Sequence, residues 1–206
     1  PVLSNPAWLA EGTAQYQRSF LDYDGWDSHR DMLLRTRVLA GEELSLADMG
    51  GFYSHSSLLR EGVYNHGFAF TRYLAATYGE DVLRRLSTAL GKWRNWNVDR
   101  AFNDAVGTPG GVVHRQWIDA MRRAYEEGTE GIRTHEVAGR LVEEDGFSNF
   151  YPAFSPDGKR LAYVSNRGEH FNLMSLYVRD LETGDRMAFD LDGLGSGEST
   201  YTCTMG

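Results

Sequence analysis

The sequence is poor in the features that mark several protein classes. Its single cysteine, Cys203, rules out a disulfide within the chain. No run of about 18 apolar residues is present, and no basic segment followed by an apolar stretch opens the sequence, so these residues show neither a membrane span nor a secretory signal. Residues 1–125 carry 14 acidic and 14 basic side chains, whereas residues 126–206 carry 15 acidic and 7 basic ones. This acidic surplus argues against a nucleic acid partner.

What is present is a globular composition, with 41% hydrophobic and 24% charged residues. Hydrophobic periodicity changes along the chain from a helical spacing to the two-residue spacing of strands. We therefore expect an α+β multidomain protein. Residues 1–128 form a helical domain, 129–146 a Gly- and Glu-rich linker, 147–192 a small antiparallel β-sheet, and 193–206 a tail.

The first helix carries the most informative residues. Asn5 can cap it and Pro6 can occupy its first position, so we expect the helix to begin at Pro6. Trp8, Glu11 and Gln15 follow at spacings of three and four, which places a carboxylate on the face of a large aromatic residue. Glu11 is then either a buried or ligating group or an ordinary solvated glutamate of the first turns.

Further helices follow from capping residues and apolar stripes. We expect them at 28–40, 64–78, 80–93, 99–106 and 112–127, with a loop that contains a short helical turn over 41–62. Gly67 suggests a close approach by another backbone or by a substrate. His29 is expected in solvent, and His114, one residue off its apolar stripe, at the surface.

The pattern Pro6, Trp8, Glu11, Gly12, Ala14 and Tyr16 resembles the glutamate-ligand helix of gluzincin metallopeptidases, the peptidase MA clan. The segment from Tyr64 to Gly79 is similar to the signature that follows that helix in the family. The resemblance implies a mainly helical domain in which Glu11 is the third protein ligand of a catalytic zinc. It also implies that Tyr64 or His66 steadies the oxyanion, whereas the alternative is that Tyr64 packs with its hydroxyl satisfied and His66 is half-exposed.

In that family the other two zinc ligands come from an upstream His-Glu-x-x-His helix. The nearest match here, His135-Glu136-Val137-Ala138-Gly139, ends in glycine and lies downstream of Glu11. We therefore expect either the downstream part of a longer enzyme or a relative that has lost the site. The zinc belongs to the parent protein, and the 206 residues alone are expected to bind none and to be inactive.

From Phe147 onward, four short strands are expected at 149–155, 159–167, 173–181 and 186–190. The run from Tyr151 to Tyr163, with Ser155-Pro156-Asp157-Gly158-Lys159, resembles the repeat of TolB-like β-propellers. The resemblance implies that the sheet is one propeller blade, which needs to dock on other elements because a lone four-stranded sheet buries little apolar area. Its exposed edges could support an oligomer.

Two functions remain open at this point, beside a glycan-binding surface for which only the content of Trp and Tyr residues argues. The first is a fragment of a zinc-dependent metallopeptidase acting on a peptide or protein substrate, with the rest of the parent chain as its partner. The second is a non-catalytic interaction module that uses the same cleft to hold a protein or peptide. The propeller resemblance implies a periplasmic or extracellular location.

Overall fold

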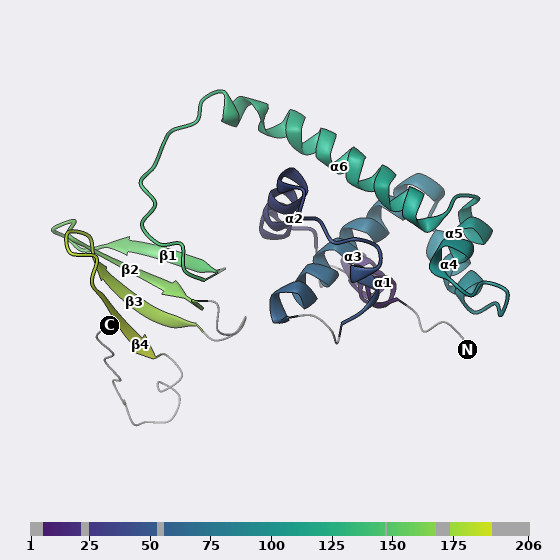
Figure 1. Cartoon of the computed structure of the whole chain (residues 1–206), viewed down its shortest axis with the longest axis horizontal. Helices are drawn as coiled ribbons and strands as arrows, with labels where there is room; N and C mark the ends of the chain where they lie inside the picture. Colours follow the sequence, from purple (N-terminus) through teal and green to yellow (C-terminus); the bar gives the residue numbers. More distant parts are fainter. Residues whose placement is uncertain (1–5, 22–24, 53–55, 147, 168–173, 191–206) are drawn as a thin grey trace. The chain divides into compact units, whose positions relative to one another are not determined.

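The computed structural model describes residues 6–21, 25–52, 56–146, 148–167 and 174–190 (Figure 1). The chain divides into two compact units, Pro1–Glu136 and Val137–Gly206. Within the described residues the first unit is helical and the second is an antiparallel sheet. The expectation of a mixed α and β protein is therefore confirmed.

The helical unit is built from α-helices and one short 3-10 helix, η1. Their bounds are α1 Ala7–Ser19, α2 Ser28–Ala40, η1 Asp48–Gly50, α3 Ser57–Tyr78, α4 Val82–Leu90, α5 Val98–Val106 and α6 Gly110–Arg133. Side-chain caps begin α2 and α5, where Asp27 and Asn97 accept hydrogen bonds from the backbone N–H groups of Arg30 and Arg100. Gly41 and Gly107 end the same helices in the left-handed conformation.

Helices α1 and α3 pack with almost no space between their backbones. A Cβ atom on Gly12 would lie 2.4 Å from the carbonyl oxygen of Gly67, and a Cβ on Gly67 would lie 2.8 Å from the carbonyl oxygen of Trp8. The close approach expected at Gly67 is thus confirmed, and it is made by another backbone. Around this crossing, Trp8, Phe70, Phe102 and Trp117 form an aromatic core with each side chain at most 1% exposed.

Two helices extend beyond their expected ends, whereas α4, expected over 80–93, is shorter and spans Val82–Leu90. Helix α3 begins at Ser57 because the Ser56 side chain accepts a hydrogen bond from the Leu59 N–H, so the expected loop over 41–62 is shorter. Helix α6 continues through Gly128 to Arg133, whereas we expected it to end at residue 127. A helical glycine costs only about 1 kcal/mol relative to alanine, which the rest of a long helix can offset. Helix α1 begins at Ala7 and not at Pro6, which occupies the cap position with ψ at 141°; Asn5, the expected cap, lies outside the described residues.

The second unit is a four-stranded meander in the order β1-β2-β3-β4, with each neighbouring pair antiparallel. The strands are β1 Asn149–Phe154, β2 Arg160–Ser165, β3 Ser175–Asp180 and β4 Arg186–Asp190. All four expected strands are present, and their ends agree to within two residues. A register shift between Phe150 and Ala153 bends β1, with Tyr151 at a positive φ of 54°. The expected tail at 193–206 lies outside the described residues.

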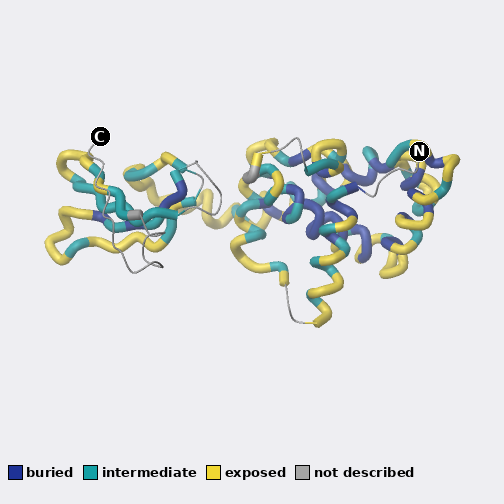
Figure 2. The backbone as a smooth tube through the Cα atoms, turned by 90° about the horizontal axis from the view of Figure 1, so that it is seen from below, coloured by how far each residue is buried: buried dark blue, intermediate teal, exposed yellow. Residues whose placement is uncertain are grey.

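Burial differs sharply between the units (Figure 2). The helical unit has a continuous buried core, whereas the buried apolar side chains of the sheet unit are Leu161 and Tyr163 among the described residues. The sheet therefore gains less from the hydrophobic effect than the helices do. Within the described ranges, none of the helices combines the length and the apolarity that crossing a bilayer requires.

Candidate functional site

Glu11 lies in α1 directly before Gly12, at the point where α1 crosses α3. Its side chain is partly buried, between the buried Trp8 and Gly12 and the exposed Ala10. It forms no hydrogen bond or ion pair with any residue that the structure describes. Glu11 is therefore a carboxylate held on a rigid helix with its oxygens free to bind a ligand.

Tyr64 lies on α3, three residues before Gly67, and is also partly buried. Its ring packs against Phe52, with the ring centroids 5.2 Å apart. Burial raises the pKa of the Tyr64 hydroxyl, and the negative charges of Glu11 and Glu61 raise it further. The structure thus brings Glu11 and Tyr64 within electrostatic range, and the Tyr64 hydroxyl stays protonated at neutral pH, as a hydrogen-bond donor must.

His66 lies on the same helix but faces the core, with 1% of its surface exposed. Its Nδ1 lies 2.8 Å from the Gly62 carbonyl oxygen, and its Nε2 accepts a hydrogen bond from the Leu44 N–H at 3.4 Å. This pattern assigns the proton to Nδ1 and leaves no free donor on the ring. His66 therefore anchors the loop that precedes η1. Of the two expected oxyanion donors, only Tyr64 has a donor group that is not already engaged.

The prediction that His114 lies at the surface is wrong. His114 is 8% exposed, its Nε2 lies 3.1 Å from the Leu44 carbonyl oxygen, and its ring meets the edges of Phe70 and Trp117. The apolar stripe of α6 is wider than its spacing suggested because aromatic side chains of α3 cover its flank. His66 and His114 together hold the N–H and C=O groups of Leu44, and no local pattern in the sequence predicts that pairing.

Protonation of His66 should destabilise the helical unit. Burial lowers the pKa of His66 from 6.5 to about 4, so between these values the unfolded chain binds a proton that the folded chain does not. The stabilisation is complete above pH 6.5 and is lost as the pH falls toward 4. We expect a loss of about 2 kcal/mol in the free energy of unfolding between pH 7 and pH 5, measured by urea titration with circular dichroism.

The matched variant for this measurement is His66→Gln, since an amide can keep both hydrogen bonds without titrating. It should reduce the dependence of stability on pH over this range and leave the part that comes from His114, whose pKa burial also lowers. His135→Gln, which alters an exposed histidine, should leave the dependence unchanged. An unaltered slope in His66→Gln would show that other groups cause the acid sensitivity.

The described residues contain no group of three or more His, Cys, Asp or Glu side chains that could hold a metal ion. Glu11 is a suitable single zinc donor, but a catalytic zinc requires three protein ligands. His29 is exposed, and His135 lies just beyond the end of α6, where its Nδ1 is 3.0 Å from the Gly131 carbonyl oxygen. These residues alone therefore do not form a zinc site.

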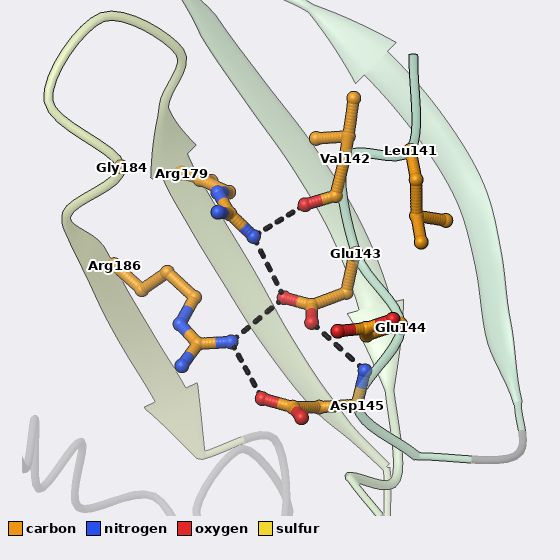
Figure 3. A pocket seen from close by; sticks show the side chains of 8 residues that line it. All are labelled: Leu141, Val142, Glu143, Glu144, Asp145, Arg179, Gly184 and Arg186. Carbon is orange, nitrogen blue, oxygen red and sulfur yellow. Dashed lines mark hydrogen bonds and ion pairs between the residues drawn. The ribbon is translucent and has the colours of Figure 1, made fainter. Parts of the chain in front are cut away.

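A buried carboxylate with several donors lies in the sheet unit, in residues that were expected to form only a linker. The Glu143 side chain is 7% exposed and accepts hydrogen bonds from the Tyr163 hydroxyl and from Arg186 at 2.9 Å. Arg179 lies 3.5 Å from the same carboxylate and also donates to the Val142 carbonyl oxygen (Figure 3).

Burial acts to raise the pKa of Glu143, but the hydrogen bonds from Tyr163 and Arg186 outweigh it and lower the pKa to about 2. Every oxygen of this carboxylate is engaged by protein donors, including the Asp145 N–H at 3.0 Å. Such saturation is typical of a structural ion network, and this one holds residues 141–145 against β3 and β4 (Figure 3). In the sequence, the only feature that points to this network is the acidic run Glu143-Glu144-Asp145.

Comparison of the chain with protein-family models, with curated proteins and with solved structures finds no match. We therefore infer function from the sequence motifs and from the geometry of the side chains. The pair Glu11 and Tyr64 is the part of the expected site that the structure brings together.

Proposed function

We propose that this chain is part of a zinc-dependent peptidase of the gluzincin type, in which Glu11 is one protein ligand of the metal and Tyr64 donates a hydrogen bond to the reacting carbonyl oxygen. The observation that carries the proposal is the Glu11 carboxylate itself. It is fixed on α1, has no partner among the described residues, and lies close enough to Tyr64 to raise the pKa of its hydroxyl.

The complete site would need two further ligands, which the described residues lack. We propose that two histidines from residues outside this sequence complete it, as the resemblance to gluzincins implies. The 206 residues alone would then bind no zinc at Glu11 and hydrolyse no peptide, because a single carboxylate cannot hold zinc tightly.

Zinc, when bound, would supply an activated water for the attack on a peptide bond. The residues of this chain would contribute the rest in two ways. Glu11 offers carboxylate oxygens from a helix that cannot shift against α3, so the ligand is preorganised. Tyr64, protonated at neutral pH, donates to the carbonyl oxygen as that atom gains negative charge. The substrate class is a peptide or a protein.

The test uses the product of the whole gene, including any residues that precede Pro1, with a peptide substrate library. Glu11→Gln should reduce both zinc content and kcat/KM by about 100-fold or more, because the amide is a poor zinc ligand. Zinc is measured by elemental analysis of the purified protein, and turnover by mass spectrometry.

Glu61→Gln is the matched control, since Glu61 also lies near Tyr64 but is not an expected ligand. It should retain zinc and activity. The proposal is wrong if the gene encodes no His-Glu-x-x-His motif and Glu11→Gln changes neither quantity. The non-catalytic interaction module would then be the better account.

We propose further that the sheet is one blade of a TolB-like propeller and that the protein acts in the periplasm or outside the cell. The four-stranded antiparallel meander supports a blade. One sheet face is apolar along paired positions and none of its side chains is fully buried, consistent with further blades packing there: Ala162, Val164, Leu176, Val178, Met187 and Phe189. Such blades would come from other parts of the parent chain.

A further inference from the structure

The helical unit contains a cleft of about 520 Å³ that has no part in the proposed zinc site. Tyr16 of α1, Met121 of α6 and the segment before α2, with Trp26, surround it, and α3 forms its floor. Neither Glu11 nor Tyr64 lines this cleft. Its volume lies in the range that holds small ligands in proteins.

Arg72 is the cation that lines the cleft, and it shares the lining with one carboxylate, Glu80. Its guanidinium lies over the Trp26 ring, 5.5 Å from the centroid, and it forms no hydrogen bond or ion pair with a described residue. Stacking holds the plane of the guanidinium but leaves the N–H groups at its edge free. Those groups form a preorganised fork for an oxygen anion.

The Trp26 ring, on which Arg72 stacks, is itself held in place. The Trp26 Nε1–H donates to the Asp31 carboxylate at 3.2 Å, and the Trp26 ring packs edge-on against Phe68, with centroids 5.8 Å apart. The entropy cost of ordering the side chains beneath Arg72 is therefore small when a ligand binds.

The acidic groups around the cleft already have donors. Both oxygens of Glu80 accept from the Tyr16 hydroxyl, at 2.9 and 2.8 Å. Asp31 accepts from Trp26 and from the Tyr125 hydroxyl, and pairs with Arg35 at 3.3 Å. Among these charged groups, Arg72 is the one without a hydrogen-bond partner in the described chain, and its exposed N–H groups can donate to an acceptor on a ligand.

The remaining walls are apolar. Trp26 and Tyr73 present aromatic rings, Ala69 and Ala76 leave room above α3, and Met121 supplies a side chain that adapts to different shapes. An anion alone would leave these surfaces in water. An apolar group attached to the anion would cover them and add the free energy of burial to that of the charged contact.

We propose that this cleft binds a carboxylate attached to an aromatic or large aliphatic group, with the carboxylate on Arg72 and the apolar group between Trp26, Tyr73 and Met121. The C-terminal residue of a peptide and a free aromatic acid share this chemistry. The inference does not depend on Glu11 or on zinc.

The test is calorimetric titration of the 206-residue chain with three probes: N-acetylphenylalanine, its neutral amide, and the tripeptide N-acetyl-Ala-Ala-Phe. The two acids should bind about tenfold or more tightly than the amide, because only they have a carboxylate for Arg72. Added salt should weaken binding of the acids. Tighter binding of the tripeptide would identify a peptide terminus as the ligand, and equal binding a free acid.

Arg72→Gln should remove the preference for acid over amide. Arg100→Gln is the matched control, because Arg100 stacks on Trp96 at 4.7 Å in the same way but outside the cleft, and it should change nothing. Ala76→Leu should fill the cleft and weaken all three probes, while circular dichroism confirms that each variant is folded. Equal binding of acid and amide, no effect of Arg72→Gln, or no saturation at millimolar probe would overturn the proposal.

Discussion

Replacing Gly12 by alanine should lower the free energy of unfolding of the helical unit by about 3 kcal/mol or more. The added Cβ would meet the carbonyl oxygen and carbon of Gly67 at 2.4 and 2.5 Å and the Thr71 hydroxyl at 2.6 Å. Two of these atoms belong to the backbone and cannot rotate away, so the helices must separate and loosen the aromatic core around Trp8. Urea unfolding followed by circular dichroism measures the loss.

The control for this experiment is Gly128→Ala on α6. Gly128 is exposed and helical, and a Cβ there would meet nothing within 4 Å. That variant should be more stable by roughly 0.5–1 kcal/mol, because alanine loses less backbone entropy than glycine when a helix forms. If Gly12→Ala were as stable as the parent chain, the tight packing of α1 on α3 would be incorrect.

Glu143→Ala should have the second large effect, in the other unit. It leaves the Tyr163 hydroxyl and the guanidinium groups of Arg179 and Arg186 without their shared acceptor. Arg186 keeps Asp145 and Arg179 keeps the Val142 carbonyl oxygen, and both guanidinium groups are partly exposed, so the loss should be about 1–3 kcal/mol, which is still large for a sheet with so small a core. We expect the backbone amides of β2 and β3 to lose most of their protection from hydrogen exchange.

Glu144→Ala changes the neighbouring carboxylate, which is exposed and has no partner among the described residues, and should leave exchange unchanged. Acid gives an independent check. Since the pKa of Glu143 is lowered from 4.5 to about 2, its contribution is complete above pH 4.5 and disappears as the pH falls toward 2. Equal protection in the two alanine variants would mean that the network does not hold the sheet.

Local patterns predicted the secondary structure well because the relevant signals lie close together in the sequence. Asp27 caps α2, Gly107 ends α5, and the Ser155-Pro156-Asp157-Gly158 turn joins β1 to β2. One error arose where a glycine was given too much weight, although its cost of about 1 kcal/mol does not end a long helix. Gly128 reads as a helix end, yet α6 continues past it for five residues to Arg133.

The candidate site could be predicted only in part. Glu11 and Tyr64 belong to motifs, so their positions were expected, whereas the use of His66 and His114 to hold Leu44 depends on residues 22 and 70 positions apart in the chain. The same reason explains why the sequence did not predict that Arg72 stacks on Trp26. Their stacking joins two segments that have no shared pattern.

The crossing of α1 and α3 has a consequence for redesign. The backbones of α1 and α3 are in direct contact at Gly12 and Gly67. No side chain therefore separates the helix that bears Glu11 from the helix that bears Tyr64. The spacing of these two groups is then a property of the backbone. Engineers could exchange apolar side chains elsewhere in the interior without disturbing it, provided that both glycines are kept.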